Sequence, residues 1–502
     1  MPEAADYWLS RFLFQRGLAL VYLIAFLVAL NQFRPLLGEH GLLPVPNFVK
    51  QVPFADSPSL FYLFPKDAAF AAVAWGGIAL SLVALTGLSG RFSLGVSTAI
   101  WAALWALYIS FVNVGQVFYG YGWETMLLEA GFCAIFLGEG ATAPNMLPLL
   151  ILRWMEFRVM FGAGLIKLRG DSCWRDLTCL DYHYETQPIP NPLSWYFHAL
   201  PKWALHGGVA FNHFIEIAVP FGYFLPQPFA TIAGALTILF QLLLMLSGNL
   251  SFLNLLTVVL AIPMLDGRLL ARLLSHAPLS HAWSRASLPF HPPAVHEAGR
   301  WHYYAVLGYA AVVVLLSIRP AINLVSSRQL MNASFEPLHL VNTYGAFGSI
   351  GRTRYEIVVE GSADAAMLDG SWRAYEFKGK PGDPMRMPPQ IAPYQLRLDW
   401  QMWFAAMSRY TDEPWFVNFV AKLLQGDRAA LSLLRVNPFP EAPPRFVRAR
   451  LYHYRFSTAA ERGKSGAWWQ REFVGQWFPP VSMESPGFRQ ILVDQGWLSP
   501  TP

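Results

Sequence analysis

The chain has 502 residues, of which 54% are hydrophobic and only 14% are charged. A typical soluble domain contains about 25% charged residues, so this composition excludes an ordinary soluble enzyme. The net charge of +5 is not gathered in a dense basic patch, which excludes a nucleic-acid-binding protein. Three cysteines are too few for a disulfide framework.

The charged residues are unevenly distributed along the chain. Residues 1–319 contain 17 Lys and Arg and 16 Asp and Glu, whereas the shorter segment 320–502 contains 20 and 16. This shift predicts a domain boundary, with a transmembrane helical bundle over 1–319 and a soluble domain over 320–502.

Nine apolar stretches in the first part approach the roughly 20 residues that a helix needs to cross a bilayer. The first follows Arg11 and Arg16 and lacks a small-residue cleavage site, so we expect a retained anchor rather than a signal peptide. The fourth stretch holds Glu124 and Glu129 and the eighth contains Pro263, so eight or nine spans are expected. The candidates are 12–33, 68–86, 92–112, 123–138, 147–167, 207–225, 229–247, 250–265 and 303–319.

Basic residues near the ends of the spans predict the orientation, because cytoplasmic loops carry the excess of Lys and Arg. With nine spans, the N-terminal arm and the loop between spans eight and nine share the cytoplasmic side. The C-terminal part and the loop 168–206 then lie together on the opposite side. The basic residues of the arm and that loop are Arg11, Arg16, Arg268, Arg272, Arg285 and Arg300.

The C-terminal part has the sequence pattern of a β-rich domain. Residues 354–360 alternate between polar and apolar and stop at Gly361, and 371–377 and 448–456 are further strand candidates. Residues 415–424, followed by Gly426, predict a short helix. The fold class is therefore a polytopic α-helical membrane protein with a C-terminal β-rich extramembrane domain.

The fifth predicted span carries four charged residues, Arg153, Glu156, Arg158 and Lys167. Arg153, Glu156 and Lys167 fall on one helix face, whereas Arg158 points elsewhere. Charges at membrane depth usually find partners inside the protein, and Arg153 and Glu156 have the spacing of an ion pair. Lys167 either reaches the interface beside that pair or borders an active cavity in which it acts as a base.

The sixth span carries His206, His213 and Glu216 along one face, with Asn212 beside it. A His and a Glu three residues apart resemble half of a metal site, but the sequence offers no matching second half. We therefore expect no metal here, and interhelical hydrogen bonds instead.

The loop 168–206 is dense in charged and aromatic residues, which is typical of the membrane face and of ordered functional loops. His183 and Glu185 are candidates for an acid and base pair, and a structured plug without chemistry is the alternative. Cys173 and Cys179 would form a disulfide if the loop faces an oxidising space. The other candidate functional residues are Arg169, Asp171, Trp174, Arg175, Asp176, Tyr184, Thr186 and Gln187.

Long strings of this chain resemble the lipase maturation factor family. The first block comprises GLIKLRGD at 164–171, CWRDLT at 173–178, YHYETQP at 182–188 and NPLSWY at 191–196. The second comprises VNTYGAFG at 341–348 and RYE at 354–356. The third comprises Trp372, Tyr375, Phe377, Lys378, Pro389, Pro393, RLDW at 397–400, Trp403 and Phe404.

The resemblance implies an endoplasmic-reticulum membrane protein that helps secreted lipases to fold and assemble, with the loop and the tail facing the lumen. The compact chain also fits a bacterial relative, for which the compartment is the inner membrane. The expected partners are the lipid bilayer and a secreted lipase or other exported client, and no cofactor is expected. Tail tryptophans would contact the client or fill the core of the tail, namely Trp372, Trp400, Trp403, Trp468 and Trp469.

A shorter string, AGLIKL at 163–168, is similar to vitamin K-dependent carboxylases and their horizontally transferred transmembrane relatives. In those proteins the lysine at the matching place is catalytic. The alternative function is therefore a carboxylase-like membrane enzyme acting on a lipid or quinone-type substrate, with Lys167 as base and Arg153, His183 or Glu185 assisting. A transporter ranks last, because the sequence shows no inverted repeat.

Overall fold

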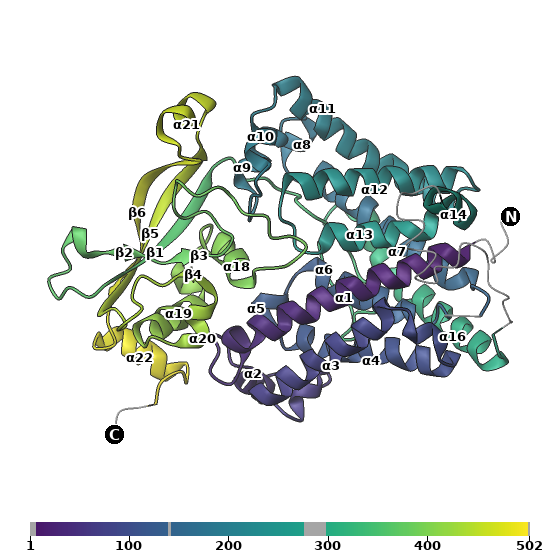
Figure 1. Cartoon of the computed structure of the whole chain (residues 1–502), viewed down its shortest axis with the longest axis horizontal. Helices are drawn as coiled ribbons and strands as arrows, with labels where there is room; N and C mark the ends of the chain where they lie inside the picture. Colours follow the sequence, from purple (N-terminus) through teal and green to yellow (C-terminus); the bar gives the residue numbers. More distant parts are fainter. Residues whose placement is uncertain (1–6, 139–141, 276–297, 500–502) are drawn as a thin grey trace.

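A computed structural model of the chain describes residues 7–138, 142–275 and 298–499. Figure 1 shows a bundle of helices and, at one end of it, a smaller part built on a β-sheet. Helix α1 (Trp8–Leu37) begins at the far end of the bundle, near α14 (Gly267–Ser275), and runs back towards the sheet.

Within the described ranges, five helices are long and apolar enough to cross a membrane, and a bent pair of helices raises the number to six. The bent pair turns by 113° between 253–264 and 267–273. The chain is therefore an integral membrane protein by the length and composition of its helices. The five are α1, α3 (Asp67–Leu85), α4 (Leu94–Asn113), α12 (Phe229–Ser247), and α16 (Arg300–Leu316) continued by α17 (Ile318–Val325); the bent pair begins with α13 (Leu253–Ala261).

Three other predicted spans are helical without being single apolar helices. The predicted span 123–138 is the short helix α6 (Gly122–Ala134), and 147–167 lies in α7 (Met146–Arg169), which carries its charges inside the bundle. The span 207–225 is interrupted, because Pro220 removes a backbone donor. It consists of α11 (Lys202–His213), a π-helical turn η4 (Phe214–Ala218) and a 3-10 helix η5 (Val219–Phe224).

The loop 168–206 folds into short helices between the bundle and the sheet. The Trp195 indole donates to the carbonyl of Ser457 at 2.7 Å, and the Trp403 indole donates to the carbonyl of Thr186 at 3.0 Å. These bonds tie the loop to the C-terminal part on one side of the molecule. The loop helices are α8 (Ser172–Arg175), α9 (Leu180–Thr186) and α10 (Ser194–His198), and further short helices in the bundle are α2 (Val45–Gln51) and α5 (Gln116–Tyr119).

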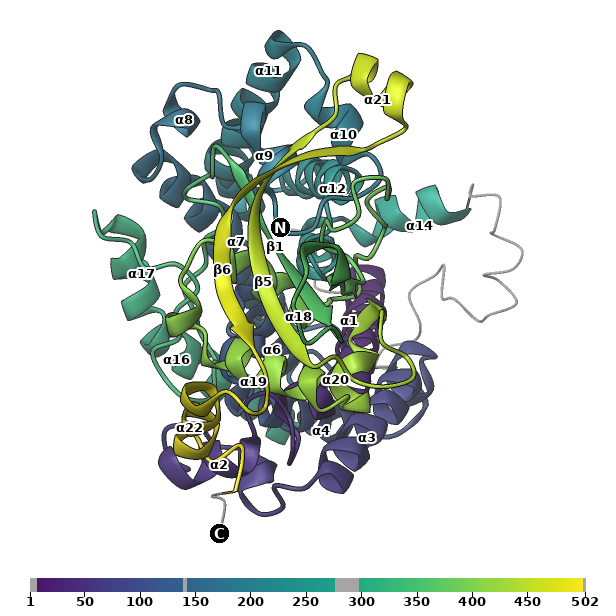
Figure 2. The same ribbon diagram turned by 90° about the vertical axis from the view of Figure 1, so that its left-hand side faces the viewer.

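The C-terminal part is built on an antiparallel sheet with strand order β2-β1-β5-β6. Figure 2 shows the long strands β5 and β6 crossing the face of the molecule, with α18 and α19 beside them. A second, two-stranded sheet pairs β3 with β4. The strands are β1 (Arg354–Ser362), β2 (Arg373–Ala374), β3 (Glu376–Phe377), β4 (Leu434–Val436), β5 (Phe446–Phe456) and β6 (Trp469–Val481). The helices are α18 (Arg397–Ala405), α19 (Pro414–Leu424), α20 (Arg428–Ser432), α21 (Ala459–Ser465) and α22 (Pro486–Asp494).

The sequence predicted part of this sheet. The strands predicted at 354–360 and 448–456 and the helix at 415–424 are confirmed, and Gly426 after the helix has the expected positive φ of 65°. The single strand predicted over 371–377 is wrong, because β2 pairs with β1 whereas β3 pairs with β4.

A continuous hydrophobic cluster joins the bundle to the C-terminal part. Trp400 packs against Tyr121 and Trp123 of the bundle, with ring centroids 5.6 Å and 5.0 Å apart. Trp400, Trp468 and Trp469 are buried, so these three fill the core rather than offering a surface to a client. Since the two parts share one core, each depends on the other for burial of its apolar surface.

Candidate functional site

The charged helix α7 ends where the bundle meets the C-terminal part, and Lys167 lies in its last turn. The Lys167 ammonium is buried, 2.5 Å from a carboxylate oxygen of Glu216 and 3.2 Å from the side-chain oxygen of Asn212. Asn212 also donates to the second oxygen of Glu216 at 2.8 Å. The three side chains therefore form a closed polar cluster of one cation, one anion and one amide.

Local backbone structure explains how Glu216 reaches Lys167. Glu216 lies in the π-helical turn η4, and such turns re-aim side chains and occur often at functional sites. Gly164 faces this turn, and a Cβ there would lie 2.8 Å from Ile217 and 3.1 Å from the Cβ of Glu216. The glycine thus allows α7 and η4 to approach closely enough for the ion pair.

Trp174 covers the Lys167 cluster from the loop. The Lys167 ammonium lies 4.9 Å from the centroid of the Trp174 ring. The indole donates to the carbonyl of Phe347 at 2.8 Å, and the Trp174 carbonyl lies 2.9 Å from Nε2 of His213. The loop, α11 and the segment after α17 therefore meet at this tryptophan.

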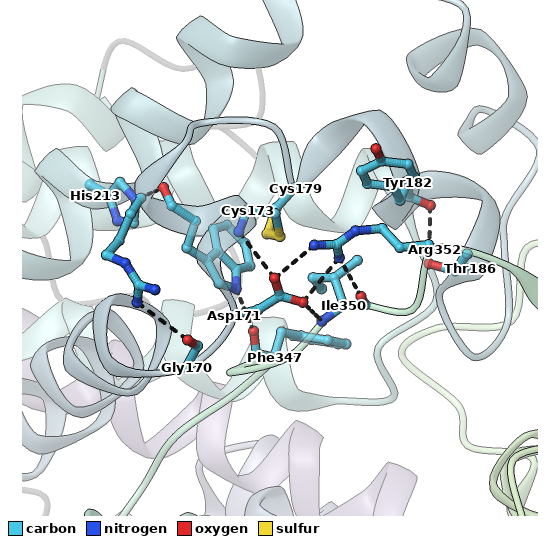
Figure 3. Close-up of a disulfide and its surroundings, with 12 residues drawn as sticks. Gly170, Asp171, Cys173, Cys179, Tyr182, Thr186, His213, Phe347, Ile350 and Arg352 are labelled. Carbon is cyan, nitrogen blue, oxygen red and sulfur yellow. Dashed lines mark hydrogen bonds and ion pairs between the residues drawn. A yellow bond between two sulfur atoms is a disulfide. The ribbon is translucent and has the colours of Figure 1, made fainter. Parts of the chain in front are cut away.

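A disulfide joins Cys173 to Cys179 beside this point, as Figure 3 shows. Asp171 caps α8 by accepting from the backbone N–H of Cys173 at 3.0 Å. It also pairs with Arg352 at 2.7 and 3.0 Å, and these hydrogen bonds lower the pKa of Asp171 to about 2. Asp171 therefore stays ionised at physiological pH and fixes the loop to the segment that leads into β1.

A cavity of about 910 Å³ opens next to the Lys167 cluster. It extends from the ends of α7, α11 and α12 to α18, so the bundle and the C-terminal part enclose it together. Most of its wall is apolar. Its polar and aromatic lining includes Lys167, Arg169, Trp174, His183, Tyr184, Asn212, Glu216, Gln241, Asn254, Arg328, Trp400 and Trp403.

His183 faces this cavity from α9. Its ring packs against Tyr184 and Phe347 and, within the part of the chain that the structure describes, makes no hydrogen bond. Burial, with a smaller contribution from Lys167, lowers the pKa of His183 to about 4, so the ring is neutral at physiological pH. Burial also raises the pKa of Tyr184 to about 12.

His183 and Glu185 do not form the predicted acid and base pair. Glu185 points away from the cavity, accepts from the backbone N–H of Phe456 at 2.7 Å and lies 3.7 Å from His198. Because His183 and Glu185 are two residues apart in the short helix α9, their side chains lie on different faces of that helix.

The predicted ion pair between Arg153 and Glu156 is also wrong. Arg153 donates to the carbonyl of Pro263 at 3.0 Å and to that of Tyr223 at 3.1 Å. Glu156 is fully buried, and among the described residues neither of its carboxylate oxygens has a hydrogen-bond partner. The carbonyls of Tyr223 and Pro263 lie at the C-terminal ends of two 3-10 helices, where they lack intrahelical donors and therefore accept from the guanidinium.

Four of the remaining candidate loop residues donate hydrogen bonds to backbone carbonyls. Gln187 donates to the carbonyls of Tyr184 and Ser247 and thus caps the end of α12. Thr186 donates to the carbonyl of Tyr182, Arg175 to that of Leu168, and Arg169 to that of Leu324. Asp176 is exposed. His206 lies 3.7 Å from Asp181, and none of the described residues forms a group of three metal-binding side chains.

Four other buried ion pairs among the described residues were not predicted, and three of them join residues at least 24 positions apart in the sequence. Arg158 pairs with Glu129, which also accepts from Tyr344 at 2.7 Å. Arg397 of α18 lies 2.8 Å from Glu124 of α6. In β1, Glu356 lies between Arg354, at 2.5 Å, and Lys380, at 2.8 Å. The only signal in the sequence was the presence of Glu124 and Glu129 inside an apolar stretch.

These observations define a class of protein: a multi-span membrane protein whose C-terminal domain closes over one end of its helical bundle. Comparison with known proteins identifies the family. The model of the lipase maturation factor transmembrane domain matches residues 9–272, and that of the lipase maturation factor C-terminal domain matches 340–479. The chain belongs to the lipase maturation factor family.

Individual relatives match over nearly the whole chain. Lipase maturation factor 1 of Homo sapiens is 44% identical and that of Mus musculus 42% identical, each over 100% of this chain and 92% and 91% of the relative. Lipase maturation factor 2 of Homo sapiens is 31% identical over 98% of this chain and 85% of its own length. No solved structure matches.

The strings that carry the resemblance meet in space. The string at 164–171 lies against 341–348, where the backbone N–H of Asp171 donates to the carbonyl of Gly348 at 2.9 Å. Arg354 of the string at 354–356 donates to the carbonyls of Glu185, Gln187 and Pro188 in the loop. The family strings therefore build the junction around the cavity.

Proposed function

We propose that this chain is a membrane-embedded maturation factor for secreted lipases or related exported proteins. The observation that carries the proposal is the match to lipase maturation factor 1 over 100% of this chain and more than nine tenths of the relative. The loop and the C-terminal domain form one continuous face at the end of the bundle, which gives a client a single surface to contact. The client itself is expected to be a lipase.

We further propose that this face is non-cytoplasmic, in the endoplasmic reticulum or, in a bacterium, outside the inner membrane. The disulfide between Cys173 and Cys179 supports this orientation, since disulfides persist in oxidising compartments. Arg268 and Arg272 lie in α14, and Arg300 begins α16. In Figure 1 these two helices lie at the end of the bundle that is away from the sheet. Arg285 lies outside the described residues. Nine spans, namely the five long helices, the bent pair, α6, α7 and the interrupted α11 segment, agree with this orientation, whereas eight would reverse it.

A glycosylation test addresses the orientation. Asp369→Asn creates the acceptor sequence Asn-Gly-Ser at a side chain that is 92% exposed. In cells with an endoplasmic reticulum, we expect the full chain to gain one glycan that a glycosidase removes. Adding Gly370→Pro destroys the acceptor and serves as the matched control. The parent sequence already holds acceptors at Asn249 and Asn332, so the informative quantity is the glycan gained over the parent. No gain in Asp369→Asn, with a lumenal reporter glycosylated in the same cells, would show the opposite orientation.

A secretion assay tests the function. Cells that lack their own lipase maturation factors would express a secreted lipase with or without this chain. We expect the chain to raise lipase activity in the medium relative to the amount of lipase protein made. If the chain accumulates in the membrane without changing the activity per lipase molecule, lipase maturation is the wrong function.

The carboxylase-like alternative requires Lys167 to accept a proton, and Lys167 is instead a donor in a buried ion pair. None of the relatives named above is a carboxylase. Lys167→Arg separates the two functions, because guanidinium keeps the positive charge but does not act as a base. We expect Lys167→Arg to retain maturation activity, whereas Lys167→Met leaves Glu216 buried without its cation and reduces the amount of folded protein.

A further inference from the structure

The cavity beside Lys167 carries an excess of positive charge. Its charged lining side chains are Lys167, Arg169 and Arg328 against the single carboxylate of Glu216, a balance of +2. Glu216 forms its ion pair with Lys167. Neither Arg169 nor Arg328 pairs with an acidic side chain among the described residues. Arg169 donates to Gln329 and Leu324 only.

The exposed part of the cavity lining contains two kinds of residue. Arg169, Ser327 and Arg328 are exposed near the end of α7. Other exposed lining residues are apolar, including Leu200, Leu243 and Phe404. Leu243 lies beside further exposed apolar residues of α12, one of the helices long and apolar enough to cross a membrane: Leu239, Leu242 and Leu246. The exposed part of the lining therefore combines apolar residues with a cationic group near the end of α7.

His183 gives a second, independent indication of a ligand. It is only 9% exposed, lines the cavity and has no hydrogen-bond partner among the described residues. Buried polar groups in proteins are nearly always hydrogen-bonded, and the described residues supply no partner for this ring. Its partner would therefore come from a molecule inside the cavity.

We propose that this cavity binds a single-chain anionic lipid, with its alkyl chain among the apolar residues and its acidic end at Arg169 and Arg328. The proposal is independent of whether the chain matures lipases. A free fatty acid and a lysophospholipid both have this chemistry.

The size of the cavity separates this ligand from larger ones. At about 30 Å³ per non-hydrogen atom, taken from the volume of a water molecule in the liquid, 910 Å³ holds about 30 atoms. This number suits one long alkyl chain with a small head group, and it is too small for a phospholipid with two chains. Three turns of a client helix, about 16 Å long and 10–12 Å wide, would need about 1,300–1,800 Å³.

A photo-crosslinking experiment tests the proposal on the full chain in phosphatidylcholine nanodiscs. The probe is palmitic acid with a diazirine in its chain, and peptide mapping locates the attached probe. We expect attachment to residues of α7, α11, α12 or α18 that line the cavity. Unlabelled palmitate or lysophosphatidic acid should compete, and whichever competes at the lower concentration identifies the natural head group. Monopalmitoylglycerol and dipalmitoyl phosphatidic acid should compete poorly.

Two variants with matched controls test the two ends of the ligand. Arg328→Gln should weaken palmitate binding about three- to fivefold, as expected for an exposed charge pair, whereas Arg435→Gln on the C-terminal domain should not. Ala163→Leu fills the cavity and should reduce crosslinking of every single-chain probe, whereas Ala235→Leu on the exposed face of α12 should not. Monodisperse size-exclusion profiles would establish that the variants are folded.

Several results would overturn the proposal. Attachment of the probe only outside the cavity lining, or equal competition by the two-chain lipid, would exclude a single-chain site. Equal competition by monopalmitoylglycerol, together with an unchanged affinity of Arg328→Gln for palmitate, would exclude recognition of an anionic end.

Discussion

Replacing Arg397 by Met should loosen the C-terminal domain from the helical bundle. The guanidinium is fully buried, 2.8 Å from Glu124, and donates to the carbonyl of Phe118 at 2.6 Å. It also stacks on Tyr119, with 3.4 Å from its central carbon to the ring centroid. Methionine keeps the apolar part of the side chain but leaves the Glu124 carboxylate buried without its cation.

Breaking one partner of a buried pair costs about 3–5 kcal/mol, most of it the penalty for the remaining charge. In a chain of this size, that cost corresponds to a fall of about 3–5 °C in the midpoint of thermal unfolding. Heating the full chain in detergent, followed by size-exclusion chromatography of what remains soluble, measures the midpoint. Limited proteolysis of the connection between α17 and β1 reports detachment of the domain.

The double variant Arg397→Met with Glu124→Gln decides whether the reasoning is right. Without its charge, residue 124 no longer needs a cation, so we expect the double variant to recover much of the lost stability. Arg455→Met, which breaks an exposed pair with Glu461, is the control and should leave the midpoint unchanged. A double variant that is less stable than Arg397→Met, or a single variant as stable as the parent, would refute the reasoning.

Three further predictions concern the loop and its surroundings. Replacing Cys173 and Cys179 by Ser opens a short cross-link and should cost about 2 kcal/mol, seen as a lower unfolding midpoint that reductant no longer changes. Because burial holds the pKa of His183 at about 4 against about 6.5 in the unfolded chain, the unfolded state binds more protons between these values. Stability should therefore fall by about 3 kcal/mol as the pH drops from about 6.5 to about 4, and His183→Gln should flatten the pH dependence of the midpoint. Gly170→Ala would place a Cβ 2.2 Å from the carbonyl oxygen of Gly348 and should destabilise by about 1–3 kcal/mol, whereas Gly207→Ala meets open space and should be neutral or stabilising; equal midpoints for the two would contradict the contact.

The sequence was sufficient for the elements that have a strong local pattern. Apolar runs of about 20 residues predicted α1, α3, α4 and α12, because membrane helices satisfy their own backbone hydrogen bonds. Alternation predicted β1 and β5 for an equally local reason.

Elements whose form depends on distant partners were not predictable. The strand β6 contains Gly475, Pro479 and Pro480, which argue against a strand, and it exists because β5 pairs with it. The helix α18 was missed because its buried Arg397 and Asp399 conceal an apolar pattern. In both elements tertiary contacts overcome a weak local preference.

The same limit applies to the candidate site. Helical geometry placed Lys167 and Glu216 correctly on the inner faces of two spans, but it does not say which helix a face meets. Their ion pair depends on the π-helical turn at Glu216 and on the small residue at Gly164, and neither was recognised in the sequence.

The distribution of the buried charges explains why the family strings are long and widely separated. Two ion pairs each lie on one side of the junction, and in each the arginine also donates to backbone carbonyls on the other side. Arg158 pairs with Glu129 inside the bundle and also donates to the carbonyl of Asn342, at 2.6 Å. Arg354 pairs with Glu356 in the sheet and also donates to three carbonyls of the loop. A change on either side leaves a buried charge without a partner, so the bundle, the loop and the C-terminal domain should lose stability together rather than one at a time.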